Sequence, residues 1–355
     1  MTTVGLLSPA ENEREVIERI HAHKRRLGSD LVILGHHYQT DTVIQCADFT
    51  GDSLELARHA AATTARLIVF CGVHFMAESA DILTRPDQTV VLPNADAGCP
   101  MADMASVDEL ESAWLQLGRI MSPDEQIMPV TYINSGAAVK AFCGLRGGLT
   151  CTSANARKIL TWALTKRPVV FFFPDEHLGR NTALSLGIPH DQMLVWNPAQ
   201  PFGGNTPDQL RKARVLLWQG HCHVHSRFRR VHVEQARLAH PQALVAVHPE
   251  CRSEVAQAAD ATGSTGFLIT YVDQAPPGST IIVGTEINLV GRLARTRLDR
   301  TVLPLGQGLC PNMFKNTAAD VLEVIEQEGR KNAIRVAAEI AEPARVALNR
   351  MLQAS

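Results

Sequence analysis

Three cysteines in similar surroundings are the residues whose type and spacing most clearly suggest chemistry. Cys99, Cys222 and Cys310 each follow a short apolar run through a turn that contains glycine. Backbone amides in such a turn can donate hydrogen bonds to sulfur and stabilise a thiolate. Three thiolates suit either zinc with one open position or an iron–sulfur cluster with one iron free, and residue chemistry leaves both interpretations open.

The cysteines close three similar stretches of sequence, each of which begins with a polar cluster after an apolar run. The clusters contain His36, Asn134 and His248, and the following cysteine lies 63, 88 and 62 residues further on. The second stretch is 25 residues longer than the first, and we assign this excess to a Pro- and Gly-rich insertion of loop character at 197–208. The chain is therefore predicted to contain three α/β repeats of one plan.

The other cysteines weaken or compete with this interpretation. The chain has no CxxC pair, and a single cysteine is commonly a buried apolar thiol. Cys151, two residues before Ser153, is the main rival ligand, and a redox role for it and for Cys143 stays open. Four cysteines have no counterpart in the other repeats and are expected to be core or incidental thiols: Cys46, Cys71, Cys143 and Cys251.

Polar strand ends would gather at one site in such a fold, since ligands of α/β sheets bind at the carboxyl ends of strands. Six side chains there combine imidazole, phenol, carboxamide and carboxylate groups: His36, Tyr38, Tyr132, Asn134, His248 and Glu250. Such donors fit an acidic substrate. Glu250 is the one carboxylate of the set and the natural general base, and His248 shares its face of an extended segment.

A small hydroxyl residue follows each cluster and could cap the next helix: Ser53, Ser153 and Thr265. Helix N-termini also bind carboxylates through free amides, so a cap and a ligand contact can coincide. The histidine-rich run HCHVH at 221–225 contains Cys222. In this run we expect His225 to approach the site and His221 and His223 to be solvated.

Composition places the chain among ordinary globular proteins. Its 355 residues predict about two to three domains, and 45% of them are apolar. The 34 basic and 36 acidic residues nearly cancel and aromatics make up only 5%, which argues against nucleic acid or an anionic membrane as a partner. The sequence shows no signal peptide and no apolar run long enough to cross a bilayer, so a cytoplasmic location is expected.

Short unalternating apolar runs alternate with helical stretches along the chain, which is typical of parallel sheets covered by helices. The expected strands are 31–34, 67–71, 90–92, 130–133, 169–173, 193–196, 215–218, 243–247, 281–283 and 302–305. The expected helices are 53–62, 107–117, 154–164, 231–240, 317–327 and 333–352, after a first helix that opens with a capping box at Ser8. The basic run at 227–230 is expected to be an exposed helix start.

These elements group into repeats with definite boundaries. We expect an N-terminal helix over 1–28 and α/β repeats over 29–118, 119–226 and 227–316. C-terminal helices over 317–355 should pack back on the body.

Dispersed motifs run in order through nearly the whole chain. They include GHHYQ at 35–39, TYINSGAAVKA at 131–141, WQGHCHVH at 218–225, VHPE at 247–250 and CPNMFKNT at 310–317. With these motifs the chain resembles the quinolinate synthase family, the iron–sulfur enzymes of de novo NAD biosynthesis. The resemblance implies three αβα sandwich domains with short parallel sheets, in a pseudo-threefold arrangement around a central [4Fe–4S] cluster.

The resemblance also implies the site residues. Cys99, Cys222 and Cys310 would bind the cluster and leave one iron open. The family's substrate contacts carry over to positions that all match: His36, Tyr38, Ser53, Tyr132, Asn134, Ser153, His248, Glu250 and Thr265.

The implied reaction condenses iminoaspartate (iminosuccinate) with dihydroxyacetone phosphate to give quinolinate, phosphate and water, with the open iron as Lewis acid. Glu250 would move protons, His248 would bind a substrate carboxylate, and Tyr38 and Tyr132 would donate to oxygens that gain negative charge. A zinc- or iron–sulfur-dependent hydro-lyase acting on another small dicarboxylate is the alternative. The resemblance allows a monomer or homodimer and a transient contact with L-aspartate oxidase.

Overall fold

The computed structural model describes residues 9–354, which form three sheets flanked by helices. Ser8, where the sequence predicts the first capping box, lies outside the described residues. None of the helices within 9–354 is long and apolar enough to cross a membrane. The chain divides into two compact units. Unit 1 comprises Met1–Gly51, Glu55–Gly98 and Pro311–Arg335, and unit 2 comprises Asp52–Leu54, Cys99–Cys310 and Val336–Ser355.

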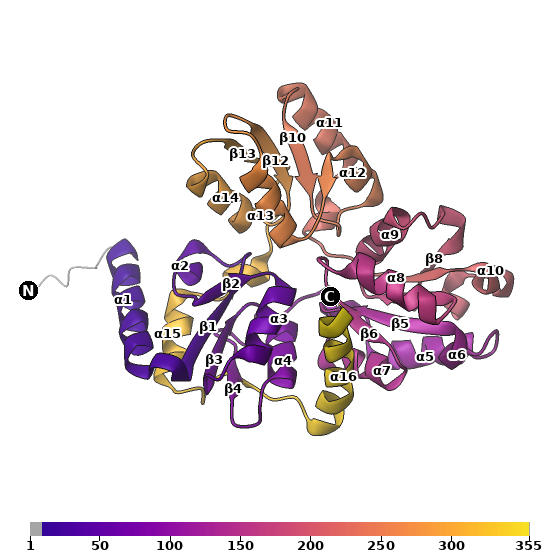
Figure 1. Cartoon of the computed structure of the whole chain (residues 1–355), viewed down its shortest axis with the longest axis horizontal. Helices are drawn as coiled ribbons and strands as arrows, with labels where there is room; N and C mark the ends of the chain where they lie inside the picture. The colour runs from indigo at the N-terminus through magenta and orange to yellow at the C-terminus, as the bar shows by residue number, and fades with distance from the viewer. Residues whose placement is uncertain (1–8, 355) are drawn as a thin grey trace, which may run out of the picture. The chain divides into compact units, whose positions relative to one another are not determined.

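Unit 1 contains one five-stranded sheet (Figure 1). Its order is β14 (Ala333–Ile334), β4 (Thr89–Val91), β3 (Leu67–Cys71), β1 (Leu31–His36) and β2 (Phe49–Gly51). All neighbours are parallel except β14, which pairs antiparallel with β4. The helices of this part of the chain are α1 (Pro9–Leu27), α2 (Asp41–Ile44), α3 (Ser53–Ala62), α4 (His74–Leu83) and α15 (Ala318–Glu326). Ile33 of β1 and Val69 of β3 belong to one buried cluster with Ile20 of α1 and Val321 of α15. The sheet is therefore buried on the face that these two helices cover.

Unit 2 contains two further sheets, both wholly parallel. The five-stranded sheet has the order β6 (Leu149–Cys151), β5 (Ile127–Tyr132), β7 (Val169–Phe173), β9 (Val215–Trp218) and β8 (Met193–Trp196). The four-stranded sheet has the order β11 (Ala261–Thr262), β10 (Leu244–Val247), β12 (Thr280–Gly284) and β13 (Thr301–Pro304). The expected fold class, α/β with several short parallel sheets, is confirmed.

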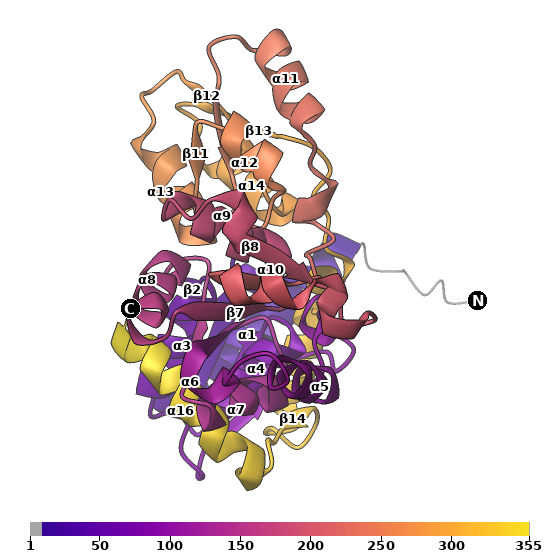
Figure 2. The ribbon, with the colours of Figure 1, turned by 90° about the vertical axis from the view of Figure 1, so that its right-hand side faces the viewer.

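Helices cover both sheets of unit 2. Those around the five-stranded sheet are α5 (Val107–Leu117), α6 (Pro123–Gln126), α7 (Ala137–Leu145), α8 (Ala156–Lys166), α9 (Glu176–Ser185), α10 (Pro207–Lys212) and α16 (Ala338–Ala354). Those around the four-stranded sheet are α11 (Arg230–Ala239), α12 (Ser253–Ala258), α13 (Thr265–Gln274) and α14 (Ile287–Thr296). Helix α16 runs beside α7 in both views (Figures 1 and 2), so the C-terminal helix is part of the core of this sheet.

One backbone hydrogen bond recurs beside all three sheets. Its donor is the first residue of the helix that follows the third strand of each sheet in chain order (α4, α9 and α14), and its acceptor is the carbonyl of an alanine or glycine in a later turn. Each acceptor carbonyl lies two residues before one of the three candidate ligand cysteines. The donor–acceptor pairs, each 2.8 Å long, are His74 to Ala97, Glu176 to Gly220 and Ile287 to Gly308. This recurrence supports the plan of three repeats.

A second contact recurs in the first and third repeats. The Asp48 carboxylate accepts the N–H of Ile33 at 2.8 Å, and the Asp260 carboxylate accepts the N–H of Val245 at 2.7 Å. In both cases the aspartate lies fifteen residues after its donor. The second repeat has Pro129 on the corresponding strand, and proline has no N–H to donate.

The extra length of the second repeat is a folded insertion rather than a loop alone. Strand β8 and helix α10 stand between α9 and β9, and the other two repeats have no such pair. The expected loop at 197–208 therefore joins two regular elements. Its last residues start α10, because Thr206 forms a capping box with Gln209 and proline occupies the first helical turn.

Two expected helix starts are wrong. Ala333 and Ile334 form β14 instead of opening the last helix, which begins at Ala338, because they pair with an exposed strand edge that local sequence does not reveal. Ser153 does not cap α8. That helix begins behind Asn155, whose side chain accepts the N–H of Thr152 at 2.6 Å.

Candidate active site and metal centre

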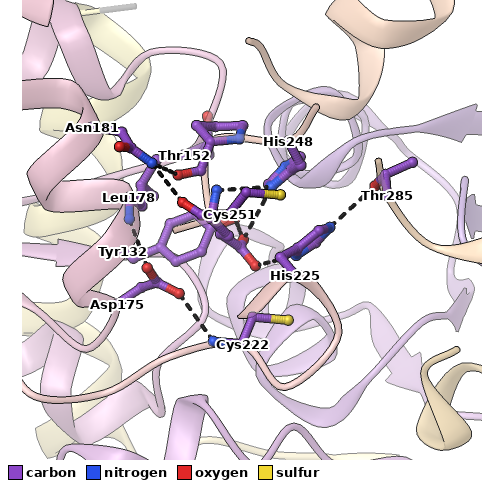
Figure 3. A network of polar contacts seen from close by, with 12 residues as sticks. Tyr132, Thr152, Asp175, Leu178, Asn181, Cys222, His225, His248, Cys251 and Thr285 are labelled. Atoms are coloured by element: carbon purple, nitrogen blue, oxygen red, sulfur yellow. Dashed lines mark hydrogen bonds and ion pairs between the residues drawn. The ribbon is translucent and has the colours of Figure 1, made fainter. Parts of the chain in front are cut away.

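Glu250 is the centre of a buried polar network in unit 2. Figure 3 labels its partners Tyr132 and His225. Its Oε1 accepts a hydrogen bond from the Tyr132 hydroxyl at 2.6 Å, and its Oε2 lies 2.8 Å from His225 Nδ1. The other ring nitrogen of His225 lies 3.1 Å from the Thr285 hydroxyl. Tyr132 ends β5, His225 follows β9 and Glu250 follows β10, so two sheets supply the network at the carboxyl ends of their strands.

His248 completes the network, and its ring stacks on that of His225. The two imidazole rings stack at 4.3 Å between centroids, as Figure 3 shows. The His248 Nδ1 accepts the backbone N–H of Glu250 at 3.4 Å. Burial and the neighbouring His225 lower the pKa of His248 to about 3, against an opposing effect of Glu250, so this ring is neutral at physiological pH.

The charge state of Glu250 follows from its partners. Burial acts to raise the pKa of this carboxyl, but the neighbouring His225 and the hydrogen bonds from His225 and the Tyr132 hydroxyl hold the pKa below its ordinary value. Glu250 is therefore ionised in the network and can accept a proton.

The three expected ligand cysteines all belong to unit 2 and are partly exposed. Burial of the sulfur raises the pKa of Cys99 to about 12, with further contributions from Cys310 and Glu250. Burial likewise raises the pKa of Cys222, and Glu250 and Cys99 add to it. The cysteines thus lie close enough to repel one another as thiolates, and a cation between them would reverse this penalty.

Among residues 9–354, the sulfur atoms of Cys99, Cys222 and Cys310 do not all lie within 4.8 Å of one another. Within residues 9–354, one set of His, Cys, Asp or Glu ligand atoms lies within 4.8 Å of one another, and it consists of Cys222, His225 and Glu250. The sulfur atoms of Cys99 and Cys310 are outside that set. One tetrahedral zinc needs all its ligands around one point, whereas cluster thiolates bind different irons and stand further apart.

The other predicted site residues divide between the two units. His36 and Tyr38 lie in unit 1, where their rings meet edge to face at 4.7 Å and the Tyr38 N–H donates to His36 Nδ1 at 3.1 Å. The remaining ones lie in unit 2 and are Ser53, Asn134, Ser153 and Thr265.

Two of the unit 2 residues have informative surroundings. The Asn134 Oδ1 is buried without a hydrogen-bond partner among residues 9–354, so this acceptor is available to a bound ligand. Ser153 lines a cavity of about 380 Å³ together with Asn181 and Pro249. Thr265 is buried as the first residue of α13, and Ser264 before it caps the helix.

The neighbouring histidines and cysteines also have definite places. His225 reaches the network, whereas His221 is exposed and His223 is half-buried. The cysteines without a repeat counterpart are buried, and so is the rival ligand; these are Cys46, Cys71, Cys143, Cys251 and Cys151.

Asp175 and Asn181 are structural parts of the site that the sequence pattern did not single out. Asp175 is fully buried, and its carboxylate accepts the N–H groups of Leu178 at 2.7 Å and Cys222 at 3.2 Å. The Asn181 amide donates to the carbonyls on both sides of Glu250, at 2.8 Å to Pro249 and 2.7 Å to Cys251. Both residues lie in the segment PDEHLGRN at 174–181. From the sequence alone, the aspartate of this segment indicates only the N-cap of a helix.

Comparisons with known proteins agree with this geometry. The family model described as Quinolinate synthetase A protein (NadA) matches residues 18–353. A quinolinate synthase of Herpetosiphon aurantiacus is 51% identical over 346 residues, which are 96% of this chain and 92% of that protein. A quinolinate synthase of Corynebacterium glutamicum is 50% identical over 354 residues, or 97% and 90% of the two chains. One of Bacillus mycoides is 45% identical and covers 96% of this chain and 93% of its own.

Proposed function

Because the chain belongs to the quinolinate synthetase A family and is a condensing enzyme of NAD biosynthesis, we propose that it joins iminoaspartate to dihydroxyacetone phosphate. The products would be quinolinate, inorganic phosphate and water. The observation that carries this proposal is the family match, which runs through nearly every element of both units. The alternative of a hydro-lyase for another dicarboxylate has no comparable support.

The proposed cofactor is a [4Fe–4S] cluster held by Cys99, Cys222 and Cys310. Their soft sulfur donors and the electrostatic influence of Cys310 on Cys99 and of Cys99 on Cys222 support this assignment. Such a group, with one iron left free by three thiolates, would supply Lewis acidity toward a substrate oxygen or nitrogen.

Glu250 and Tyr132 are the proposed proton-handling pair. A carboxylate whose pKa lies below the ordinary value is ionised but weakly basic. When the Tyr132 hydroxyl turns to a substrate oxygen that gains negative charge, Glu250 loses one of the bonds that lower its pKa and becomes a stronger base. His225 keeps the carboxylate in place by its contact with Glu250 Oε2.

The proposed substrate contacts are neutral donors and acceptors. His248 is uncharged, so it would bind a substrate carboxylate through a hydrogen bond rather than as a cation. Asn134 has an unsatisfied oxygen and would accept a donor of the substrate. The family contacts assign substrate binding also to His36, Tyr38, Ser53, Ser153 and Thr265.

Organisation beyond the site follows the same family. The repeat boundaries at 29–118, 119–226 and 227–316 remain our proposal, with a pseudo-threefold arrangement of the sheets. We also propose a cytoplasmic enzyme that acts as a monomer or homodimer and meets L-aspartate oxidase transiently to receive its unstable imine.

The test is an assay under anaerobic conditions with iminoaspartate generated in place. Quinolinate and phosphate should form in equal amounts, and only when dihydroxyacetone phosphate is present. Release of water or ammonia from a dicarboxylate without any need for dihydroxyacetone phosphate would instead establish the hydro-lyase alternative.

A further inference from the structure

One buried carboxylate in unit 2 holds both a helix start and a candidate ligand cysteine. Asp175 precedes α9 and accepts the N–H of Leu178 in the first turn of that helix and the N–H of Cys222. Each oxygen therefore has its own task, since Oδ1 caps the helix and Oδ2 holds the cysteine backbone.

Glu286 occupies the equivalent place before α14, where its Oε2 accepts the N–H of Asn288 at 2.7 Å. Its Oε1 is buried without a hydrogen-bond partner among residues 9–354, so only the helix cap of this arrangement is repeated there. The side chains of Asp175 and Glu286 are both 0% exposed, which is unusual for acidic residues. In the second repeat a buried acid thus binds the amide of a candidate ligand cysteine.

A glycine two residues before Cys222, and another two residues before Cys310, tightens the corresponding turn. A Cβ on Gly220 would lie 2.3 Å from the carbonyl oxygen of Pro174, the residue before Asp175. A Cβ on Gly308 would lie 2.4 Å from the carbonyl oxygen of Thr285, the residue before Glu286. Only glycine permits this backbone approach, so each cysteine turn packs directly on the segment that carries a capping carboxylate.

The first repeat lacks this device. Val73 occupies the corresponding position before α4 and makes no side-chain cap. The sulfur of Cys99 instead accepts backbone N–H groups of Met101 and Ala102. The carboxylates are therefore not a general requirement of the strand–helix turn, since one repeat forms it without them.

We propose that Asp175 is a positioning residue that presets Cys222 for the metal centre by fixing its backbone amide. This inference rests on the proposed ligation of the cluster by Cys222. The carboxylate touches the ligand through the main chain and leaves the sulfur atom free for iron. Loss of this contact would loosen the ligand turn, while the helix cap can be preserved by a shorter polar side chain.

The test compares variants that separate helix capping from cysteine positioning. Asp175→Ser keeps a good cap but is too short to reach the cysteine amide as well. Anaerobically loaded protein is mixed with an iron chelator, and the loss of visible absorbance is followed. We expect iron release on the order of 10- to 100-fold faster than in the wild type.

The control is Val73→Ser, which adds a cap in a repeat where no carboxylate holds the cysteine and should leave release unchanged. Equal release rates for the wild type and Asp175→Ser would overturn the inference while the proposed cofactor stands. A wild-type chain that never takes up iron would show that the proposed function itself has failed.

Discussion

The hydroxyl of Tyr132 donates a 2.6 Å hydrogen bond to Glu250, a residue 118 positions later in the chain. Tyr132 ends β5, the first strand of its sheet in chain order, and Glu250 follows β10, the first strand of the next sheet in chain order. Because both residues are almost completely buried, the bond is not weakened by competition from water. The pair therefore links two repeats through the group that we propose handles protons.

Replacement of that carboxylate tests its chemical role. Glu250→Gln keeps the size and a hydrogen-bond acceptor but cannot take up a proton at neutral pH. We expect quinolinate formation to fall by about 10²- to 10⁴-fold, with the cluster spectrum unchanged. Glu254→Gln, the same change four residues further along, should have normal activity.

A structural role for Glu250 predicts a different pattern. In that case Glu250→Gln would lose iron and activity in proportion, and activity per bound cluster would stay near that of the wild type. Activity per cluster is thus the decisive quantity for this variant.

Because the pKa of His248 is low, its contribution to kcat/KM should not change with pH in the physiological range. A ring with a pKa of about 3 stays neutral as pH falls from about 8 to 6, whereas an ordinary histidine gains a proton near 6.5. The ratio of kcat/KM between the wild type and His248→Asn should therefore be constant across this range. A ratio that grows as pH falls through 6.5 would mean that the charged ring binds the substrate.

Two glycines inside helices should respond to alanine with opposite signs. A Cβ on Gly144 in α7 would lie 1.9 Å from the carbonyl oxygen of Pro343 in α16, so Gly144→Ala must separate the two helices. A Cβ on Gly291 in α14 would meet only the movable guanidinium of Arg295, at 3.0 Å. We expect Gly144→Ala to lower the free energy of unfolding by roughly 1–3 kcal/mol or more.

Gly291→Ala should leave that free energy unchanged or raise it by up to about 1 kcal/mol, because alanine favours the helix. Thermal unfolding of both variants checks the pair. A Gly144→Ala protein with an undiminished melting temperature would show that α16 does not dock closely on α7.

Strands that form one continuous apolar run could be predicted from sequence, but the shortest ones could not. Strands β3, β7, β8 and β9 have the expected bounds, because each such run is bounded by a polar residue, glycine or proline. The six-residue strands β1 and β5 were expected but have other bounds. Strands β2, β6 and β11 have three residues or fewer, so no periodic pattern can develop in them. Strand β14 depends on the free edge of β4, which is a property of the folded sheet.

The candidate site was predictable where repeat spacing marked it. Spacing singled out the three cysteines and the polar strand ends at Tyr132 and Glu250, and the structure brings this tyrosine and glutamate into contact. Asp175 escaped, because an acid before a helix is an ordinary cap and only the fold shows that it also holds a cysteine.

The nature of the metal centre is the central claim, and the structure leaves one concrete rival. Cys222, His225 and Glu250 alone could bind a single ion, and that site would need neither Cys99 nor Cys310. The two possibilities differ in stoichiometry and in the cysteines they require.

The most direct measurement is iron and acid-labile sulfide per chain in anaerobically purified wild type, Cys99→Ser, Cys310→Ser and Cys251→Ser. We predict about four irons and four sulfides in the wild type and in Cys251→Ser, whose cysteine is buried away from solvent, and near-complete loss in the other two. About one metal ion per chain, without sulfide and unaffected by Cys99→Ser and Cys310→Ser, would contradict the account.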